Sequence, residues 1–332
     1  SWNIQIIDQN ASGVGYGFCP ISLDSDDNPC IVYSGHPSVR YASWNGSNWN
    51  IQKIAYGSAH DLVLDTNDNP HITFGHLAYA CWNGTWWDIQ TVSTDYTVYS
   101  ALALDSYGNP HVAYITGDEL KYGSSNGSSW TIQTVTVDKN LPDINPWLSL
   151  ELDSNNIPHL MYYTESSYVD QTIGGARSVN IKLAVLSNSH WNIEPVLSSL
   201  NFSNFGNMVL DSNDNPHFIC TQSHYLSAEN PMLLSTIFYI SWDGSTWNIQ
   251  TVASNSTSSN IGFLTLGPDD RPHILHFADG IIYTRLTGTT WQNYTVDIKS
   301  DRLCQLAIDS NGNPHLSYLL SLIHISEPTR PY

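Results

Sequence analysis

Short apolar segments alternate with polar turns along the whole chain, and one such unit recurs. Each copy has a small apolar strand ending in Asp, a polar turn with Pro and usually His, and a second apolar strand. The seven copies begin at Leu23, Leu64, Leu104, Leu152, Leu210, Leu266 and Ile308. After the first six copies comes a tight turn and a strand with Trp, as in SWDGSTWNIQTV at 241–252. Self-similarity at a roughly fixed period predicts a repeat architecture.

Each unit predicts four strands. In the third copy they are 101–104, 111–115, 120–124 and a segment from Trp130 onward, with an Asn-Gly hairpin signal before the last. No segment has a convincing helical period. Four short strands every 40 to 58 residues (from one unit's Pro to the next) are typical of propeller blades. We therefore expect an all-β fold, a seven-bladed β-propeller of four-stranded antiparallel blades.

The two ends of the chain complement each other. Residues 1–7 (SWNIQII) match the fourth strand of a unit, and the seventh unit lacks that strand. We expect the N-terminal strand to complete the seventh blade, in its own ring or in a neighbouring subunit, where repeated exchange would build a filament. Residues 1–321 are thus one domain. Residues 322–332 carry no repeat residues and resemble adaptor read-through, although 322–326 could also serve as the third strand of the last blade.

Composition narrows the class of partner. The net charge is −19 with only 11 Lys and Arg, which argues against nucleic acid and anionic membrane surfaces as partners. No apolar run reaches membrane-spanning length. Few charges beside many Ser, Thr, Asn, Tyr and Trp indicate a secreted or cell-surface, extracellular protein.

Two kinds of covalent modification are predicted. Cys19 and Cys304 occupy the same position in the first and last repeats, so a disulfide could staple the ring, the alternative being two buried thiols. N-glycosylation is predicted at seven Asn-x-Ser/Thr sequences: Asn10, Asn45, Asn83, Asn126, Asn201, Asn255 and Asn293.

One turn resembles a known motif. Ser241, Asp243, Gly244, Thr246 and Trp247 are similar to the Asp-box of sialidase-type propeller blades, although most copies here have Asn for Asp. The resemblance implies the fold. It does not imply the arginine triad of those glycosidases, because the six arginines share no repeat position. The whole repeat resembles the Asp-x-x-Gly-Asn-Pro-His-type repeats of secreted propellers.

The recurring His and Asp residues invite metal hypotheses. Equivalent positions on a wide ring cannot converge on one ion, so the repeat histidines are expected to bond the adjacent turn or blade. The Asp-x-Asn-x-Asn turns resemble the start of a calcium loop but lack its Gly at position six and Glu at position twelve. We predict hairpin turns, no metal site and no cofactor, with calcium as the alternative.

Two insertions mark a candidate ligand face. Residues 163–179 and 221–236 are expected to be long loops between second and third strands of adjacent blades. They would gather a ligand or partner site or merely cover this face: Glu165, Tyr168, Asp170, Arg177, His224, Tyr225 and Glu229.

We predict a non-enzymatic, structural or adhesive propeller with no catalytic residues, which self-assembles into a filament or surface layer. Its partners would be copies of itself, glycans or cell-surface proteins, with no nucleic acid and no membrane insertion. A monomeric carbohydrate-binding lectin is the first alternative. A glycosidase or lyase on the long-loop face is the second.

Overall fold

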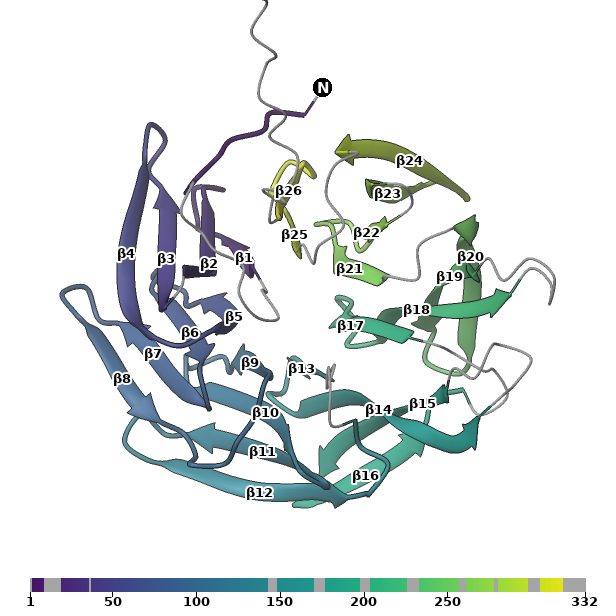
Figure 1. Ribbon diagram of the computed structural model, residues 1–332, viewed down its shortest axis with the longest axis horizontal. Coiled ribbons are helices and arrows are strands. Elements are labelled where there is room, and N and C mark those ends of the chain that lie inside the picture. Colours follow the sequence, from purple (N-terminus) through teal and green to yellow (C-terminus); the bar gives the residue numbers. More distant parts are fainter. Residues whose placement is uncertain are drawn as a thin grey trace, which may run out of the picture.

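The protein is a ring of β-sheets (Figure 1). The computed structural model describes residues 2–8, 19–35, 37–142, 148–169, 177–197, 204–225, 233–256, 261–277, 280–297 and 305–318. Their strands form six four-stranded antiparallel sheets and one two-stranded sheet. The expected all-β propeller of four-stranded antiparallel blades is confirmed. The expected number of blades is wrong, because the structure has six of them rather than seven.

The first three blades contain twelve strands. They are β1 (Ile21–Leu23), β2 (Pro29–Gly35), β3 (Ser38–Trp44), β4 (Trp49–Tyr56), β5 (Ala59–Leu64), β6 (Pro70–Phe74), β7 (Ala78–Trp82), β8 (Trp87–Thr91), β9 (Ser100–Leu104), β10 (Pro110–Thr116), β11 (Glu119–Ser125) and β12 (Trp130–Val137).

The next three blades and the small sheet contain fourteen more. They are β13 (Leu148–Leu152), β14 (Pro158–Val169), β15 (Arg177–Ser187), β16 (His190–Pro195), β17 (Asn204–Leu210), β18 (Pro216–Tyr225), β19 (Leu233–Trp242), β20 (Trp247–Ser256), β21 (Ile261–Leu266), β22 (Pro272–Phe277), β23 (Ile281–Thr287), β24 (Thr290–Asp297), β25 (Gln305–Ile308) and β26 (Pro314–Ser317).

Each blade runs from the centre of the ring to its rim in sequence order, so the first strand of each sheet is innermost (Figure 1). Because neighbouring strands are antiparallel, the turns between first and second strands lie on the same face as those between third and fourth. We call this the repeat-turn face. The opposite face, which carries the turns between second and third strands and the links between blades, is the connection face.

The repeat turns form as their chemistry predicts. In blade 3, Asp105 Oδ1 accepts hydrogen bonds from Tyr107 N at 2.9 Å and from Asn109 N at 2.7 Å. Gly108 between them has φ of 80°. The second hairpin is closed by Asn126, whose Oδ1 accepts from Ser128 N and Ser129 N at 3.0 Å. Asp and Asn side chains thus replace the backbone bonds that a tight turn leaves unmade.

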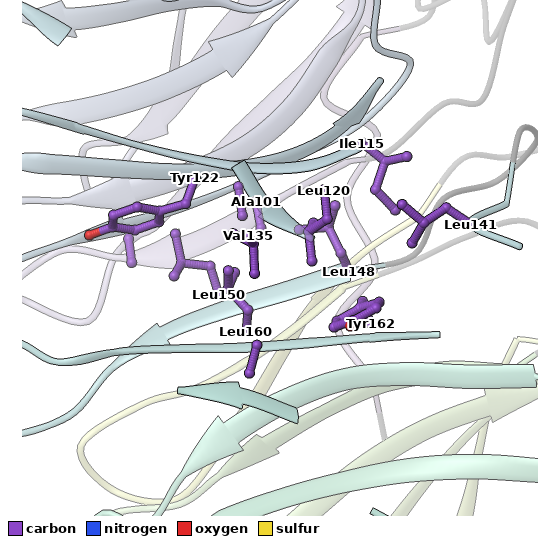
Figure 2. Packing of buried hydrophobic residues seen from close by; sticks show 13 residues of the cluster. Ala101, Ile115, Leu120, Tyr122, Val135, Leu141, Leu148, Leu150, Leu160 and Tyr162 are labelled. Atoms are coloured by element: carbon purple, nitrogen blue, oxygen red, sulfur yellow. The ribbon is translucent and has the colours of Figure 1, made fainter. Parts of the chain in front are cut away.

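The core lies between neighbouring blades. Figure 2 shows the cluster between blades 3 and 4, where Leu120 of β11 and Leu150 and Leu160 of the next sheet interdigitate. These three leucines are at most 3% exposed. Burial stabilises each by about 2 kcal/mol, so packing of one sheet face against the next holds the ring together.

A hydrogen-bonded link on the repeat-turn face joins most neighbouring units. Ser154 donates from N and Oγ to the two carboxylate oxygens of Asp214, at 2.9 and 2.6 Å. Asp214 has φ of 64°, a conformation that Asp tolerates better than most residues. The same link occurs three more times, in the pairs Ser25–Asp68, Ser212–Asp270 and Ser310–Asp27. The last pair joins the seventh unit to blade 1 and closes the ring.

The seventh unit forms only β25 and β26 in the described part of the chain. Residues 2–8 lie at the rim of this position: Trp2 Nε1 donates to Thr295 O at 3.1 Å, and Gln5 Oε1 accepts from Trp49 Nε1 at 3.0 Å. These residues pair with no strand, so the expectation that they complete a seventh four-stranded blade is corrected. A backbone ladder would require a third strand between them and β26, and residues 319–332 lie outside the described residues.

The two insertions are not simply loops. Strands β14 and β15 continue the ladder outward, with Glu165 opposite Val179 and Val169 opposite Arg177. Likewise, β18 and β19 pair from His217–Ser241 to Tyr225–Leu233. The expectation of long loops over 163–179 and 221–236 is therefore corrected, because backbone hydrogen bonds extend a hairpin whatever the polarity of its side chains.

None of the described residues forms a helix of the length and apolar character needed to cross a bilayer.

Candidate active site

The repeat histidines serve the scaffold. His71 bonds the Tyr79 hydroxyl through Nδ1, and its Nε2 lies 3.7 Å from Asp65 of its own turn. Burial lowers the pKa of His71, and Asp65 only partly offsets this effect. The pattern recurs at His111, His217 and, with the tyrosine alone, at His273. The expectation that these imidazoles bond their own blades is confirmed.

The repeat aspartates are also occupied. Asp65 Oδ1 accepts from Asn67 N and Asn69 N, both at 2.8 Å, and Oδ2 accepts from Asn69 Nδ2 at 3.0 Å. These bonds outweigh burial and lower the pKa of Asp65. No group of three or more His, Cys, Asp or Glu that could hold a metal ion occurs among the described residues.

The seven predicted site residues are only partly placed. Glu165 is half-buried on β14, and its backbone N donates to Asn140 O at 2.8 Å. The backbones of Tyr168, Arg177, His224 and Tyr225 lie near the ends of the extended hairpins, with side chains outside the described part. Asp170 and Glu229 lie outside it altogether, so convergence of this set stays a prediction.

The predicted modification sites are likewise untested. Cys19 is buried, and Cys304 lies outside the described residues. Asn45, Asn83 and Asn126 are exposed at their turns, and Asn293 accepts from Thr284 Oγ1 at 2.8 Å. The remaining sequons, Asn10, Asn201 and Asn255, have no described side chains.

Unusual polar residues gather instead where the inner strands of blades 2 and 3 meet the connection face. His60 is 2% exposed, and its Nδ1 lies 3.1 Å from Ser100 Oγ on the next inner strand. Its ring lies 6.4 Å from that of Tyr99. Burial, helped by the charge of His76, lowers the pKa of His60 to about 4. The imidazole is therefore neutral at neutral pH.

Asp61 is the next residue on β5. Its Oδ2 accepts from Leu102 N of blade 3 and its Oδ1 from Leu62 N, both at 2.9 Å. Burial raises the pKa of Asp61 to about 7, although these two bonds lower it. In blade 5, Asn207 ties the equivalent strands by bonding both N and O of Leu264 at 2.8 Å. A neutral amide thus suffices for this tie, and the carboxyl of Asp61 adds the ability to titrate.

Two further groups belong to this site. Glu151 on the inner strand of blade 4 is half-buried, and burial together with the charge of Asp61 raises its pKa to about 8. Burial, with a smaller contribution from Asp61, raises the pKa of the Tyr99 phenol well above its ordinary value. Groups whose pKa lies near neutrality, together with protonated donors, are suited to general acid–base chemistry.

The rim of the site is aromatic. His76 lies in the turn between β6 and β7, and its ring centroid is 5.0 Å from that of Tyr96. Tyr96 is 66% exposed. We define the candidate active site as His60, Asp61, Tyr99, Ser100 and Glu151, with His76 and Tyr96 at its rim.

The sequence contains a signal for this site. His60 stands five residues before its repeat Asp, where other copies have Cys19, Ser100, Leu148, Gly206, Gly262 and Cys304. Asp61 and Glu151 are likewise the only acids at their positions in the inner strands. These departures are visible when the seven copies are aligned on the repeat Asp. The two insertions lie elsewhere in the repeat and give no indication of them.

Comparison with known proteins supports the fold. No protein-family model and no curated protein matches the sequence. Among solved structures, a PL25 polysaccharide lyase (ulvan lyase) matches with a TM-score of 0.66 and 13% identity, over 91% of this chain and 89% of the other. Virginiamycin B lyase from Staphylococcus aureus matches with a TM-score of 0.61 and 11% identity, over 90% and 91%. The polysaccharide lyase Uly1 matches with a TM-score of 0.58 and 8% identity, over 90% and 85%.

These neighbours correct the functional expectation. A non-enzymatic, structural or adhesive propeller was predicted, with a filament favoured and an enzyme ranked last, yet three of the most similar structures are lyases. The Asp-box resemblance gains no family match either. At 8–13% identity the likeness establishes a shared propeller fold, and chemistry must be argued from this chain's own residues.

Proposed function

We propose that the chain is a lyase that cleaves a uronate-containing polysaccharide by β-elimination at the connection face of blades 2 to 4. One observation carries the proposal: the inner-strand residues that depart from the repeat, above all His60, Asp61 and Glu151, meet at one place. The lyase structures that share the fold support the reaction class, and two of them are polysaccharide lyases.

The reaction needs a base and an acid. A base removes the proton from the carbon next to the uronate carboxylate. The electron pair forms a C=C bond, the C–O bond at the β carbon breaks, and an acid gives the leaving oxygen its proton. No water is consumed, and one fragment ends in an unsaturated sugar.

Asp61 fits the base better than His60 does. With a pKa of about 7, Asp61 is ionised in good part at neutral pH and still accepts a proton readily. His60, with a pKa of about 4, is a weaker base, and its contact with Ser100 suits it to positioning. The Tyr99 phenol keeps its proton at neutral pH and can supply it to the leaving oxygen.

Glu151 would help an anionic sugar to approach. Its pKa of about 8 keeps it protonated at neutral pH, so the site carries less negative charge than its residues suggest. A neutral carboxyl can also donate a hydrogen bond to the substrate carboxylate.

The test is turnover of ulvan and other uronate-containing polysaccharides, followed by the ultraviolet absorbance of the unsaturated product. Asp61→Asn and Tyr99→Phe should each lower kcat about 100-fold or more. The matched control is Tyr107→Phe, because Tyr107 is 84% exposed on the repeat-turn face. New reducing ends without unsaturated sugar, or no product from any uronate polymer, would overturn the proposal.

A further inference from the structure

The connection face presents a pair of aromatic rings whose exposure the fold does not require. Tyr96 is 66% exposed and its ring is tilted by 40° to that of His76. Aromatic side chains that only fill space are mostly covered, as Tyr79 and Tyr114 are in the same two blades. A fixed ring open to solvent offers an apolar face with polar edges, which matches the C–H face and hydroxyl edge of a pyranose.

The His76 side of the pair is rigid. Gly75 N donates to Ser58 O at 2.9 Å, and Leu77 O accepts from Val92 N at 3.1 Å, so the backbone is tied on both sides of His76. Leu77 has φ of 95°, and its side chain is completely buried. A leucine in this region costs about 1–2 kcal/mol, and burial of its side chain holds it there. Strained backbone of this kind clusters at functional sites.

The Tyr96 side is tied as well. The preceding residue, Asp95, accepts from Tyr114 Oη and from Lys121 Nζ, each at 3.0 Å. Thr97 on the other side donates from Oγ1 to Tyr99 O at 2.7 Å. Because both neighbours of Tyr96 are held, its backbone loses little conformational entropy when a ligand packs on the ring.

The pair also lies next to the reacting groups. Strands β5 and β6 pair through Ala59 and Phe74, and Gly75 N donates to Ser58 O at 2.9 Å, so His76 lies beside the end of the strand that carries His60. Tyr96 precedes Tyr99 in the same connection between blades. We propose that Tyr96 and His76 form a stacking subsite that holds a pyranose ring of the polysaccharide beside the linkage to be cleaved. This subsite rests on the proposed function for its substrate and concerns binding alone.

Binding can be measured apart from turnover by native electrophoresis through gels that contain ulvan. In the Asp61→Asn background, which removes the proposed base, Tyr96→Ala should raise the Kd for ulvan about tenfold, as loss of one stacked ring predicts. Tyr96→Phe and Tyr96→Trp keep a ring and should keep retention. Tyr107→Ala removes an exposed tyrosine from the other face and should leave the Kd unchanged.

Each result decides something. Loss of retention in Tyr96→Ala without any unsaturated product from wild-type protein would keep the subsite and remove the lyase. Equal retention of Tyr96→Ala and its background would overturn the subsite even where product forms. Absence of retention for the unaltered chain on ulvan would overturn it too. His76→Ala is measured in the same gels as a second variant. A folding defect that affects Tyr96→Ala alone is then not mistaken for loss of the subsite.

Discussion

Trp2 stands edge-on to Tyr283, with ring centroids 5.6 Å apart and planes at 84°. Trp87 meets Tyr41 of the preceding blade at 5.6 Å and 74°, and Trp130 meets Tyr79 at 5.4 Å and 72°. The N-terminal segment therefore makes the contact that a fourth strand makes elsewhere, at a position where it joins no sheet.

This contact predicts that Trp2→Ala destabilises the ring. The loss should be about 2 kcal/mol in chemical denaturation, since a half-buried indole and its bond to Thr295 O are removed. The control is Trp86→Ala, whose side chain is 60% exposed and should matter by less than about 0.5 kcal/mol. Equal stability of both variants would show that residues 2–8 do not hold the ring.

The link between Ser154 and Asp214 depends on two features, the hydrogen bonds of the Asp214 carboxylate and the backbone conformation of Asp214. Asp214→Gly keeps the backbone at φ of 64° but removes both bonds from Ser154, and should cost about 1 kcal/mol. Asp214→Ala should cost about 1 kcal/mol more, because alanine disfavours that conformation. Gly108 and Gly312 occupy the equivalent position in two other units. A higher Tm for Asp214→Ala than for Asp214→Gly in thermal unfolding would contradict this account.

Asp61→Asn should make the protein more stable and less active. The unfolded chain releases the Asp61 proton near pH 3.8, whereas burial raises the pKa of Asp61 in the folded protein to about 7. The free energy of unfolding therefore falls as the pH rises from 3.8 to 7, and the full loss is present above pH 7. Asparagine makes the same tie without a charge, as Asn207 does. At pH 8 the free energy of unfolding of Asp61→Asn, measured with denaturant, should exceed that of wild type by about 2 kcal/mol. This value takes into account that solvent near the carboxyl screens its charge. The gain should vanish near pH 4, and a gain that persists there would refute the electrostatic cause.

His276 predicts a loss of stability in acid. It is 2% exposed, its Nε2 lies 2.9 Å from Thr284 Oγ1, and burial lowers its pKa to about 4. The unfolded chain takes up the proton first, near pH 6.5, so the penalty builds as pH falls from 6.5 to 4. Across that window wild type should lose about 3 kcal/mol more than His276→Gln. The exposed His190 supplies the control, and His190→Gln should retain the wild-type slope.

The scaffold was accessible from sequence because its determinants are local. The bonds that Asp105 accepts from Tyr107 N and Asn109 N span only two and four residues, so turn chemistry and strand alternation were enough to predict each hairpin. The number of complete blades was not accessible in this way. It depends on whether residues 2–8 enter a backbone ladder or, as found, bond through the side chains of Trp2 and Gln5.

The candidate site was missed for a different reason. His60 and Asp61 look like ordinary residues of one repeat, and Glu151 lies two blades away. Their proximity and their shifted pKa values arise only when the ring brings inner strands together and removes water from them. The polar insertions depart more visibly from the repeat, although Glu165 and its neighbours continue an ordinary ladder.

The glycine at position 108 has a mechanical consequence for blades 2 and 3. Without a side chain there, Thr66 has no carboxylate partner of the kind that Ser154 finds in Asp214. Along their inner strands these two blades are instead fastened at the opposite end, where His60 meets Ser100 and Asp61 holds Leu102 N. The inner-strand hydrogen bonds between these two blades therefore lie within the candidate site itself. Any change to His60 or Asp61 consequently alters the contact between two blades as well as the chemistry of the site.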